Sequence, residues 1–185
     1  MAKLVLSSSD PLTQQILALG INSWEDLLLY VKNIPYGRNA NREDLSLVIK
    51  ENKGSCSSKH AFLKEVADLN KILNIELMIG IYKMNEKNTK IGTILSDNNI
   101  DFIPEAHCYL KIDGVRIDCT TPKSDFAKIE KDILEEIEIE PFQVGKYKIE
   151  YHQSFIKDWL FHSNATITFG QLWAVREQCI AFLSQ

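Results

Sequence analysis

Residues 107–118 read HCYLKIDGVRID, and this stretch decides how the sheet of the protein is built. Residues that favour strands flank Asp113-Gly114, a dipeptide typical of the two-residue type I′ turn of a β-hairpin. With this turn, Tyr109 faces Asp118 across the two strands, and His107 shares their face because side chains alternate with a period of two. We therefore expect His107 and Asp118 to be diagonal neighbours within hydrogen-bonding distance. A register shift of one residue would place them on opposite faces.

A cysteine upstream stands where a nucleophile could meet this pair. Residues 51–62 read ENKGSCSSKHAF, and the spacing of apolar residues predicts a helix from Cys56 to about Leu73. A helix N-terminus lowers the pKa of a thiol, and its free N–H groups can bind an oxyanion. His107 would take the thiol proton and Asp118 would hold the imidazole in the useful tautomer. Cys56, His107 and Asp118 are therefore the candidate catalytic residues.

Length and composition indicate one ordinary globular domain. The 185 residues are 45% apolar and 25% charged, and the net charge is −4. A chain of this size can bury a real core, and without a basic face we expect no nucleic acid partner. The N-terminus lacks the apolar run of a signal peptide, and no stretch approaches the ~18 apolar residues of a membrane span. These features predict a cytoplasmic protein with no membrane partner and with four free thiols.

The order of predicted elements is helices, then strands, then helices, which is typical of an α+β fold. We expect a single domain over residues 1–185, with N-terminal helices in 9–32, a core of about 34–122, and a C-terminal strand and helices in 146–184. The remaining predicted elements are a helix over 42–51, a strand over 76–82, a mostly loop segment over 83–100, a helix over 124–135, a strand over 146–151 and helices over 153–161 and 168–183.

Three blocks of the sequence resemble the transglutaminase-like superfamily of papain-type thiol enzymes. GSCSSKHAF at 54–62 resembles its Gly-x-Cys-x-x-x-x-Ala nucleophile helix, and residues 71–82 resemble the helix end, small turn and strand that follow. Residues 105–122, EAHCYLKIDGVRIDCTTP, resemble its His strand, hairpin and Asp strand. The resemblance covers about residues 50–122. It implies a papain-like core, with the nucleophile helix packed on a mostly antiparallel sheet.

The resemblance also implies acyl transfer from an amide through a Cys56 thioester. The chain departs from the family pattern in two ways: Cys108 directly follows His107, and no Gln stands upstream as a second oxyanion donor. Tyr36 is the candidate substitute for that donor. We expect a peptide, protein or small amide as substrate and no cofactor, and we favour hydrolysis over cross-linking. The oligomeric state is left open.

Three alternatives compete with this interpretation. The chain could be a binding or scaffold protein with the fold but no turnover. It could also be an acyltransferase that uses a coenzyme A thioester and a Cys-His-Asp triad similar to that of arylamine acetyltransferases. Finally, Cys56 and His60 share a helix face and could bind a metal together with Cys108 and Cys119. The hairpin turns both of those cysteines away from His107, so we expect core thiols and no metal.

Overall fold

The computed structural model describes residues 3–163 and 165–184, and it is an α+β fold. Within these residues, four strands form one antiparallel sheet in the order β3-β2-β1-β4. The strands are β1 (Ile75–Met84), β2 (Ile103–Ile112), β3 (Val115–Ile117) and β4 (Ile133–Ile139). The chain thus has the mixed architecture predicted from its element order.

Seven α-helices surround the sheet in the described part of the chain. They are α1 (Pro11–Ala18), α2 (Trp24–Asn33), α3 (Leu47–Lys50), α4 (Cys56–Leu69), α5 (Ile94–Asp97), α6 (Lys146–Ser163) and α7 (Phe169–Leu183). Three short 3₁₀ turns are η1 (Phe126–Lys128), η2 (Glu130–Asp132) and η3 (Pro141–Val144). None of the described helices is both long and apolar enough to cross a bilayer.

The hairpin forms with the predicted register. Asp113 and Gly114 both have positive φ, 49° and 78°, as a type I′ turn requires. Ile112 pairs with Val115, and the ladder ends where Leu110 pairs with Ile117. Asp118 therefore lies one residue beyond the paired strand.

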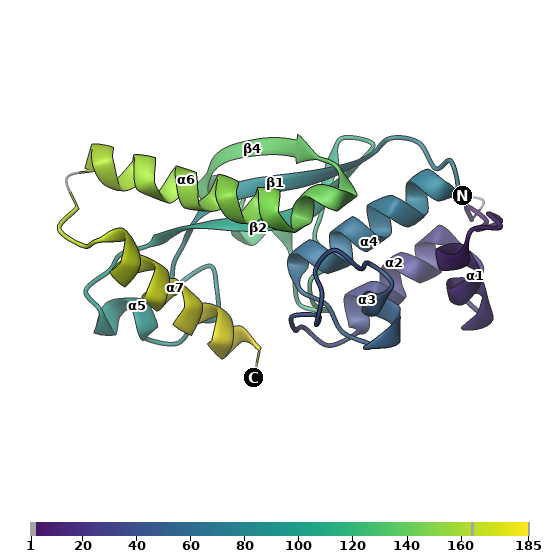
Figure 1. The fold of residues 1–185 in the computed structure, drawn as a ribbon, viewed down its shortest axis with the longest axis horizontal. Helices are drawn as coiled ribbons and strands as arrows, with labels where there is room; N and C mark the ends of the chain where they lie inside the picture. The colour runs from purple at the N-terminus through teal and green to yellow at the C-terminus, as the bar shows by residue number, and fades with distance from the viewer. Residues whose placement is uncertain (1–2, 164, 185) are drawn as a thin grey trace.

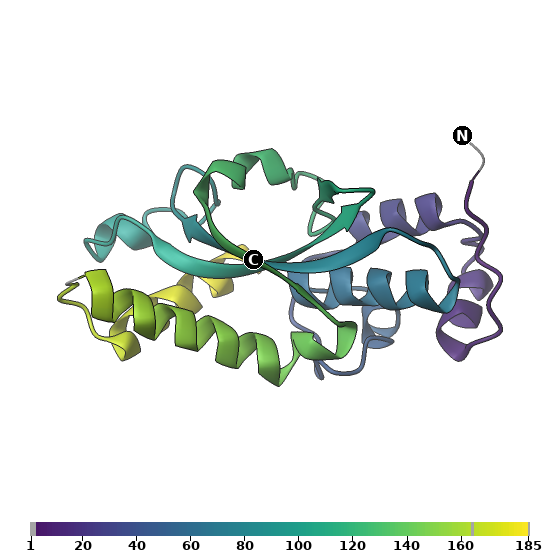
Figure 2. The same cartoon turned by 90° about the horizontal axis from the view of Figure 1, so that it is seen from above.

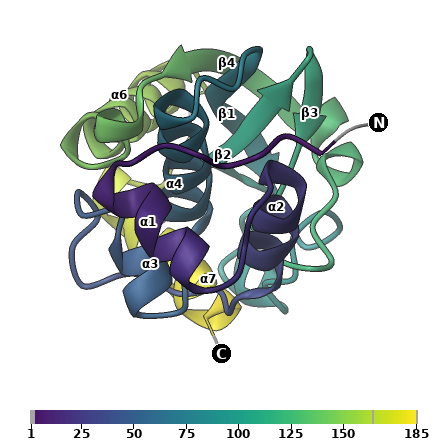
Figure 3. The ribbon, with the colours of Figure 1, turned by 90° about the vertical axis from the view of Figure 1, so that its right-hand side faces the viewer.

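Alternate side chains of β1 enter two different clusters. Leu77, Ile79 and Ile81 pack with α4 and the N-terminal helices. Met78 and Tyr82 belong to the second cluster, which contains Phe126 and Ile129 as well as residues of the C-terminal helices. Figure 1 shows α4 and α6 end to end along the sheet, and Figure 2 shows both on the side opposite the arch of residues 118–133. The end-on view in Figure 3 shows the sheet curving over α4.

The prediction of a strand over residues 146–151 is wrong. These residues begin the 18-residue helix α6. The segment KYKIEY alternates in the manner of a strand, but Lys148, His152 and Ile156 are buried at intervals of four. A helical period becomes visible only over that longer window.

Three other predicted elements have different limits in the structure. The helix over 42–51 is reduced to α3, and α4 ends at Leu69 rather than Leu73. Lys71 and Asn74 have positive φ, which turns the chain back into β1 and stops the helix. The helix predicted over 124–135 is replaced by η1, η2 and the start of β4.

Candidate functional site

Cys56 is the first residue of α4, and its local sequence explains the position. Ser55 is the N-cap, and Ser55 and Ser58 form a reciprocal capping box: the Ser58 Oγ accepts from the Ser55 N–H at 2.9 Å and the Ser55 Oγ accepts from the Ser58 N–H at 3.4 Å. The Cys56 N–H lies in the first turn, where N–H groups have no intrahelical acceptor. Cys56 is also the only one of the four cysteines that is not buried.

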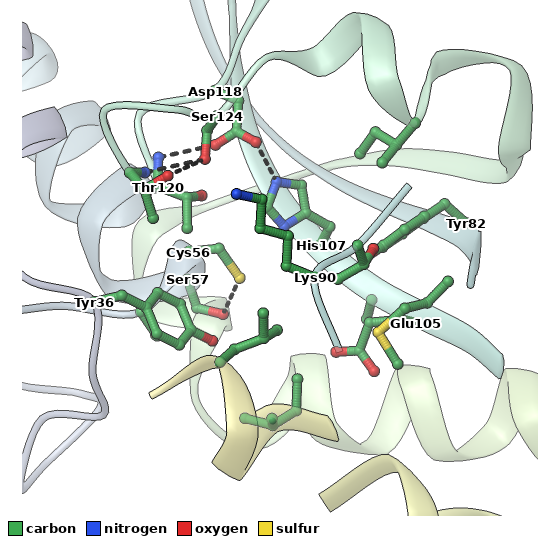
Figure 4. Close-up of a pocket in the computed structure, with 18 of the residues that line it drawn as sticks. Tyr36, Cys56, Ser57, Tyr82, Lys90, Glu105, His107, Asp118, Thr120 and Ser124 are labelled. Atoms are coloured by element: carbon green, nitrogen blue, oxygen red, sulfur yellow. Dashed lines mark hydrogen bonds and ion pairs between the residues drawn. The ribbon is translucent and has the colours of Figure 1, made fainter. Parts of the chain in front are cut away.

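The predicted contact between His107 and Asp118 is present. The His107 Nε2 and the Asp118 Oδ2 are 2.9 Å apart, and the second carboxylate oxygen accepts the Thr120 N–H at 2.9 Å. Figure 4 shows the imidazole between Asp118 and the Cys56 sulfur. The Nδ1 atom of His107 is therefore the nitrogen left to face the thiol.

An isolated parallel β-bridge between Tyr36 and Gly54 holds Tyr36 beside the start of α4. The Gly37 N–H donates to the Gly54 carbonyl at 3.2 Å, and the Gly54 N–H donates to the Pro35 carbonyl at 3.1 Å. A Cβ on Gly54 would lie 2.8 Å from the Lys59 Cγ, so the close approach requires glycine. In Figure 4 the Tyr36 hydroxyl lies on the same side of the cavity as the sulfur.

The charges of the site favour a thiolate beside an imidazolium. Burial raises the pKa of a thiol, but the charges of Lys148 and His107 outweigh burial and lower the pKa of Cys56 to about 6. Burial likewise disfavours a charged imidazole, yet Asp118 and Cys56 raise the pKa of His107 well above its ordinary value. Because the pKa of Cys56 lies below that of His107, the proton resides on the imidazole near neutral pH.

A single cavity of about 410 Å³ opens onto these groups. Cys56, His107, Asp118 and Tyr36 all line it. The four candidate residues, which come from three separate parts of the sequence, therefore share one space. Comparison with known protein families, curated proteins and solved structures found no match.

Lys148 is a site residue that the sequence analysis did not find. It projects from α6, is 7% exposed, and donates from its Nζ to the Ser57 Oγ at 2.7 Å. The same hydroxyl oxygen lies 3.9 Å from the Cys56 sulfur. The buried Lys148 amine is therefore joined to the Cys56 sulfur through one serine. The only signal in the sequence was the four-residue spacing of the buried face of α6, which the strand prediction concealed.

His60 has a structural role that its spacing from Cys56 did not reveal. Its ring is fully buried; the Nδ1 bonds the Cys56 carbonyl oxygen at 2.7 Å, and the Nε2 accepts the Cys119 N–H at 2.7 Å. Burial lowers the pKa of His60 to about 4, so the ring is neutral with its proton on Nδ1. His60 thus ties the start of α4 to the residue after Asp118.

Lys59 fixes the two loops that flank the site. Its buried Nζ donates to the carbonyl oxygens of Ile34 and Thr120, both at 2.7 Å. One of these acceptors lies two residues before Tyr36 and the other two residues after Asp118. The lysine therefore holds both segments against α4.

The metal alternative places Cys108 and Cys119 beside Cys56 and His60. Both Cys108 and Cys119 are buried in the hydrophobic cluster that packs with α4, as expected for core thiols. Across residues 3–163 and 165–184, no three His, Cys, Asp or Glu side chains are grouped to hold a metal ion.

Proposed function

We propose that this chain is a thiol-dependent acyl-transfer enzyme that acts on an amide or peptide-like bond. One observation carries the proposal: a sulfur at a helix N-terminus shares a cavity with an imidazole that a buried carboxylate orients at 2.9 Å. This is the arrangement that nucleophilic catalysis needs, with a nucleophile, a base and a group that orients the base. Resemblance to transglutaminase-like enzymes supports the same chemistry.

In the first step, the Cys56 thiolate would attack the carbonyl carbon and form a C–S bond. The carbonyl electron pair moves to oxygen, and the Cys56 N–H and the Tyr36 hydroxyl are the proposed donors to that oxyanion. Burial raises the pKa of Tyr36, so its hydroxyl keeps the proton that it would donate. The C–N bond then breaks, and His107 gives its proton to the leaving amine.

In the second step, His107 would take a proton from water, and the hydroxide would attack the thioester. The acid and the Cys56 thiolate are the products, and the imidazole is again protonated. Asp118 keeps the ring orientation and stabilises its charge in both steps. We favour water as the acceptor, because the cavity is open to solvent and is lined by polar and charged side chains.

The test is formation of an acyl-enzyme on Cys56 from an activated ester such as p-nitrophenyl acetate. We expect a burst of nitrophenol and one acetyl group on Cys56 by peptide mass mapping. Cys56→Ser should abolish the burst, and Asp118→Asn should slow acylation by ~10²-fold or more with the fold unchanged. Cys179→Ser, which removes a buried thiol on α7, is the matched control and should retain the burst.

Equal and slow acetylation of all four cysteines would contradict the proposal. It would instead favour the binding or scaffold alternative. Acetyl transfer from acetyl-coenzyme A to Cys56, without reaction of amides or simple esters, would favour the acyltransferase.

A further inference from the structure

The cavity that contains Cys56 has positively charged walls, although the whole chain carries a net charge of −4. Seven Lys or Arg side chains line it, against three Asp or Glu. Besides Lys148, the cations are Arg38, Arg42, Lys90, Lys123, Lys128 and Arg176. The positive charge is therefore local to the candidate site.

The three acids of the cavity already have partners. Asp118 is bonded to His107, and the buried Glu105 accepts two hydrogen bonds from Arg176, at 2.8 and 2.6 Å. Asp125 accepts the Ala127 N–H at 3.1 Å as the cap of η1. Two of the three carboxylates are thus bonded to His107 and Arg176, and the third caps η1, so cations outnumber acids in the cavity wall.

Arg42 differs from the other three arginines of the chain. Arg38 pairs with Glu177, Arg116 with Glu136 and Arg176 with Glu105. Arg42 is half-buried in the cavity wall, and among the described residues no acidic side chain lies within ion-pair distance of it. Burial, followed by repulsion from the like charges of Arg38 and Arg176, lowers the pKa of Arg42, although a guanidinium remains protonated at neutral pH.

We propose that Arg42 binds an anionic group of the substrate, so that the site acts on acyl compounds that carry a carboxylate or a phosphate near the scissile bond. This inference rests on the proposed function of Cys56. A guanidinium presents paired N–H donors that match either oxyanion. A substrate anion would supply the partner that Arg42 lacks, and Lys90, Lys123 and Lys128 would attract it from solvent.

Two alkylating reagents test the charge preference directly. With either reagent the Cys56 thiolate supplies the electron pair of a new S–C bond, and iodide leaves with the electrons of the C–I bond. Iodoacetate carries a carboxylate, whereas iodoacetamide is neutral and of similar size. The ratio of their rate constants at Cys56, followed by peptide mass mapping, is independent of the fraction of thiolate. The two reagents differ in intrinsic reactivity, so the change in this ratio between the wild type and a variant reports how the site treats the anion.

We expect the intact protein to react faster with iodoacetate than with iodoacetamide. Arg42→Gln should lower the ratio by about threefold to tenfold, and Arg42→Lys should give an intermediate ratio. Lys50→Gln removes an exposed charge outside the cavity and should leave the ratio unchanged. If the Gln variant does not fold, the ratio in the wild-type protein should still fall as ionic strength rises.

Glutarate and inorganic phosphate, added as competitors, distinguish the two kinds of anion. Stronger protection of Cys56 by glutarate assigns a carboxylate, and stronger protection by phosphate assigns a phosphoryl group; either result supports the inference. An unchanged ratio in Arg42→Gln, or no protection by either anion, overturns it. If the inference about Arg42 fails but Cys56 still reacts rapidly with iodoacetamide, the proposed thiol chemistry is unaffected. Slow reaction of Cys56 with both reagents would contradict the thiol chemistry too.

Discussion

At the scale of single residues, the four cysteines show how the surroundings of a thiol change its pKa. Burial raises the pKa of Cys119 and of Cys179 to about 11, and burial also raises the pKa of Cys108. Cys56 has the opposite shift because Lys148 and His107 bring positive charge to its sulfur. Reactivity follows the thiolate, so only Cys56 is suited to nucleophilic attack near neutral pH.

The pH dependence of alkylation tests this difference. With a pKa of about 6, the thiolate fraction of Cys56 should rise about tenfold between pH 5 and pH 7 and then level off. His107→Gln removes a positive neighbour and should move the midpoint upward. The measurement is the rate of iodoacetamide labelling at Cys56 against pH. A midpoint near the ordinary thiol value of ~8.5 would contradict the assigned environment.

At the scale of secondary-structure elements, the position of His107 depends on how β1 and β2 pack. Gly80 pairs with His107 across these strands, and the ring of the neighbouring Tyr109 covers Gly80. A Cβ at Gly80 would lie 2.9 Å from the Tyr109 Cε1 and 3.2 Å from the Ile133 Cδ1. Tyr109 is also stacked 6.2 Å from the His107 ring. The glycine therefore makes room for the ring beside the catalytic candidate.

Gly80→Ala should lower the free energy of unfolding by about 1–3 kcal/mol, because the added methyl group overpacks a filled space. The same change should slow Cys56 acylation by displacing Tyr109 and, with it, His107. Gly170→Ala is the matched control: a Cβ there has no neighbour within 4 Å, and alanine favours helix α7. Denaturant unfolding measures both variants, and equal stabilities would contradict the packing argument.

Helix α6 makes a second contribution at this scale through Lys148. Lys148→Met keeps most of the side-chain bulk but removes the charge, so the pKa of Cys56 should rise by about 1 unit. Lys146→Met is the control on the same helix, since the Lys146 side chain is 82% exposed. The alkylation midpoint of Cys56 should move in the first variant only. A shift of equal size in both would show that general charge, rather than the buried ammonium, sets the pKa.

At the scale of the whole molecule, an ion pair in the wall of the cavity joins the C-terminal helix to the sheet. Arg176 on α7 and Glu105 on β2 are both largely buried, and 71 residues separate them in the sequence. Arg176 also contacts Glu177, which pairs with Arg38. The C-terminal helix is thereby attached both to the sheet and to the loop that carries Tyr36.

Arg176→Met should lower the free energy of unfolding by about 3–5 kcal/mol, because it leaves the Glu105 carboxylate buried without its partner. The double variant Glu105→Leu with Arg176→Met should recover much of that loss, since no charge is then stranded. Chemical unfolding of the wild type, Glu105→Leu, Arg176→Met and the double variant measures the cycle. A double variant as unstable as the sum of the two single variants would contradict the pairing.

The sequence predicted the parts of the site that depend on local chemistry. Asp113-Gly114 determined the hairpin register and, with it, the meeting of His107 and Asp118. The spacing of apolar residues predicted that α4 begins at Cys56. The strand prediction at 146–151 was wrong because alternation over six residues cannot distinguish a strand from one face of a longer helix.

The sequence by itself therefore determined the turns, the helix starts and the face that each strand residue shares, because these depend on neighbours within a few residues. Only the tertiary structure decided that Lys148 reaches Ser57 and that His60 joins α4 to the Asp118 segment. The structure alone also decided that Arg42 shares the Cys56 cavity with no acidic side chain of the described residues within ion-pair distance. These relations depend on how separate helices pack against the curved sheet. Packing is set by the combined burial of many side chains, so no short pattern in the sequence encodes it.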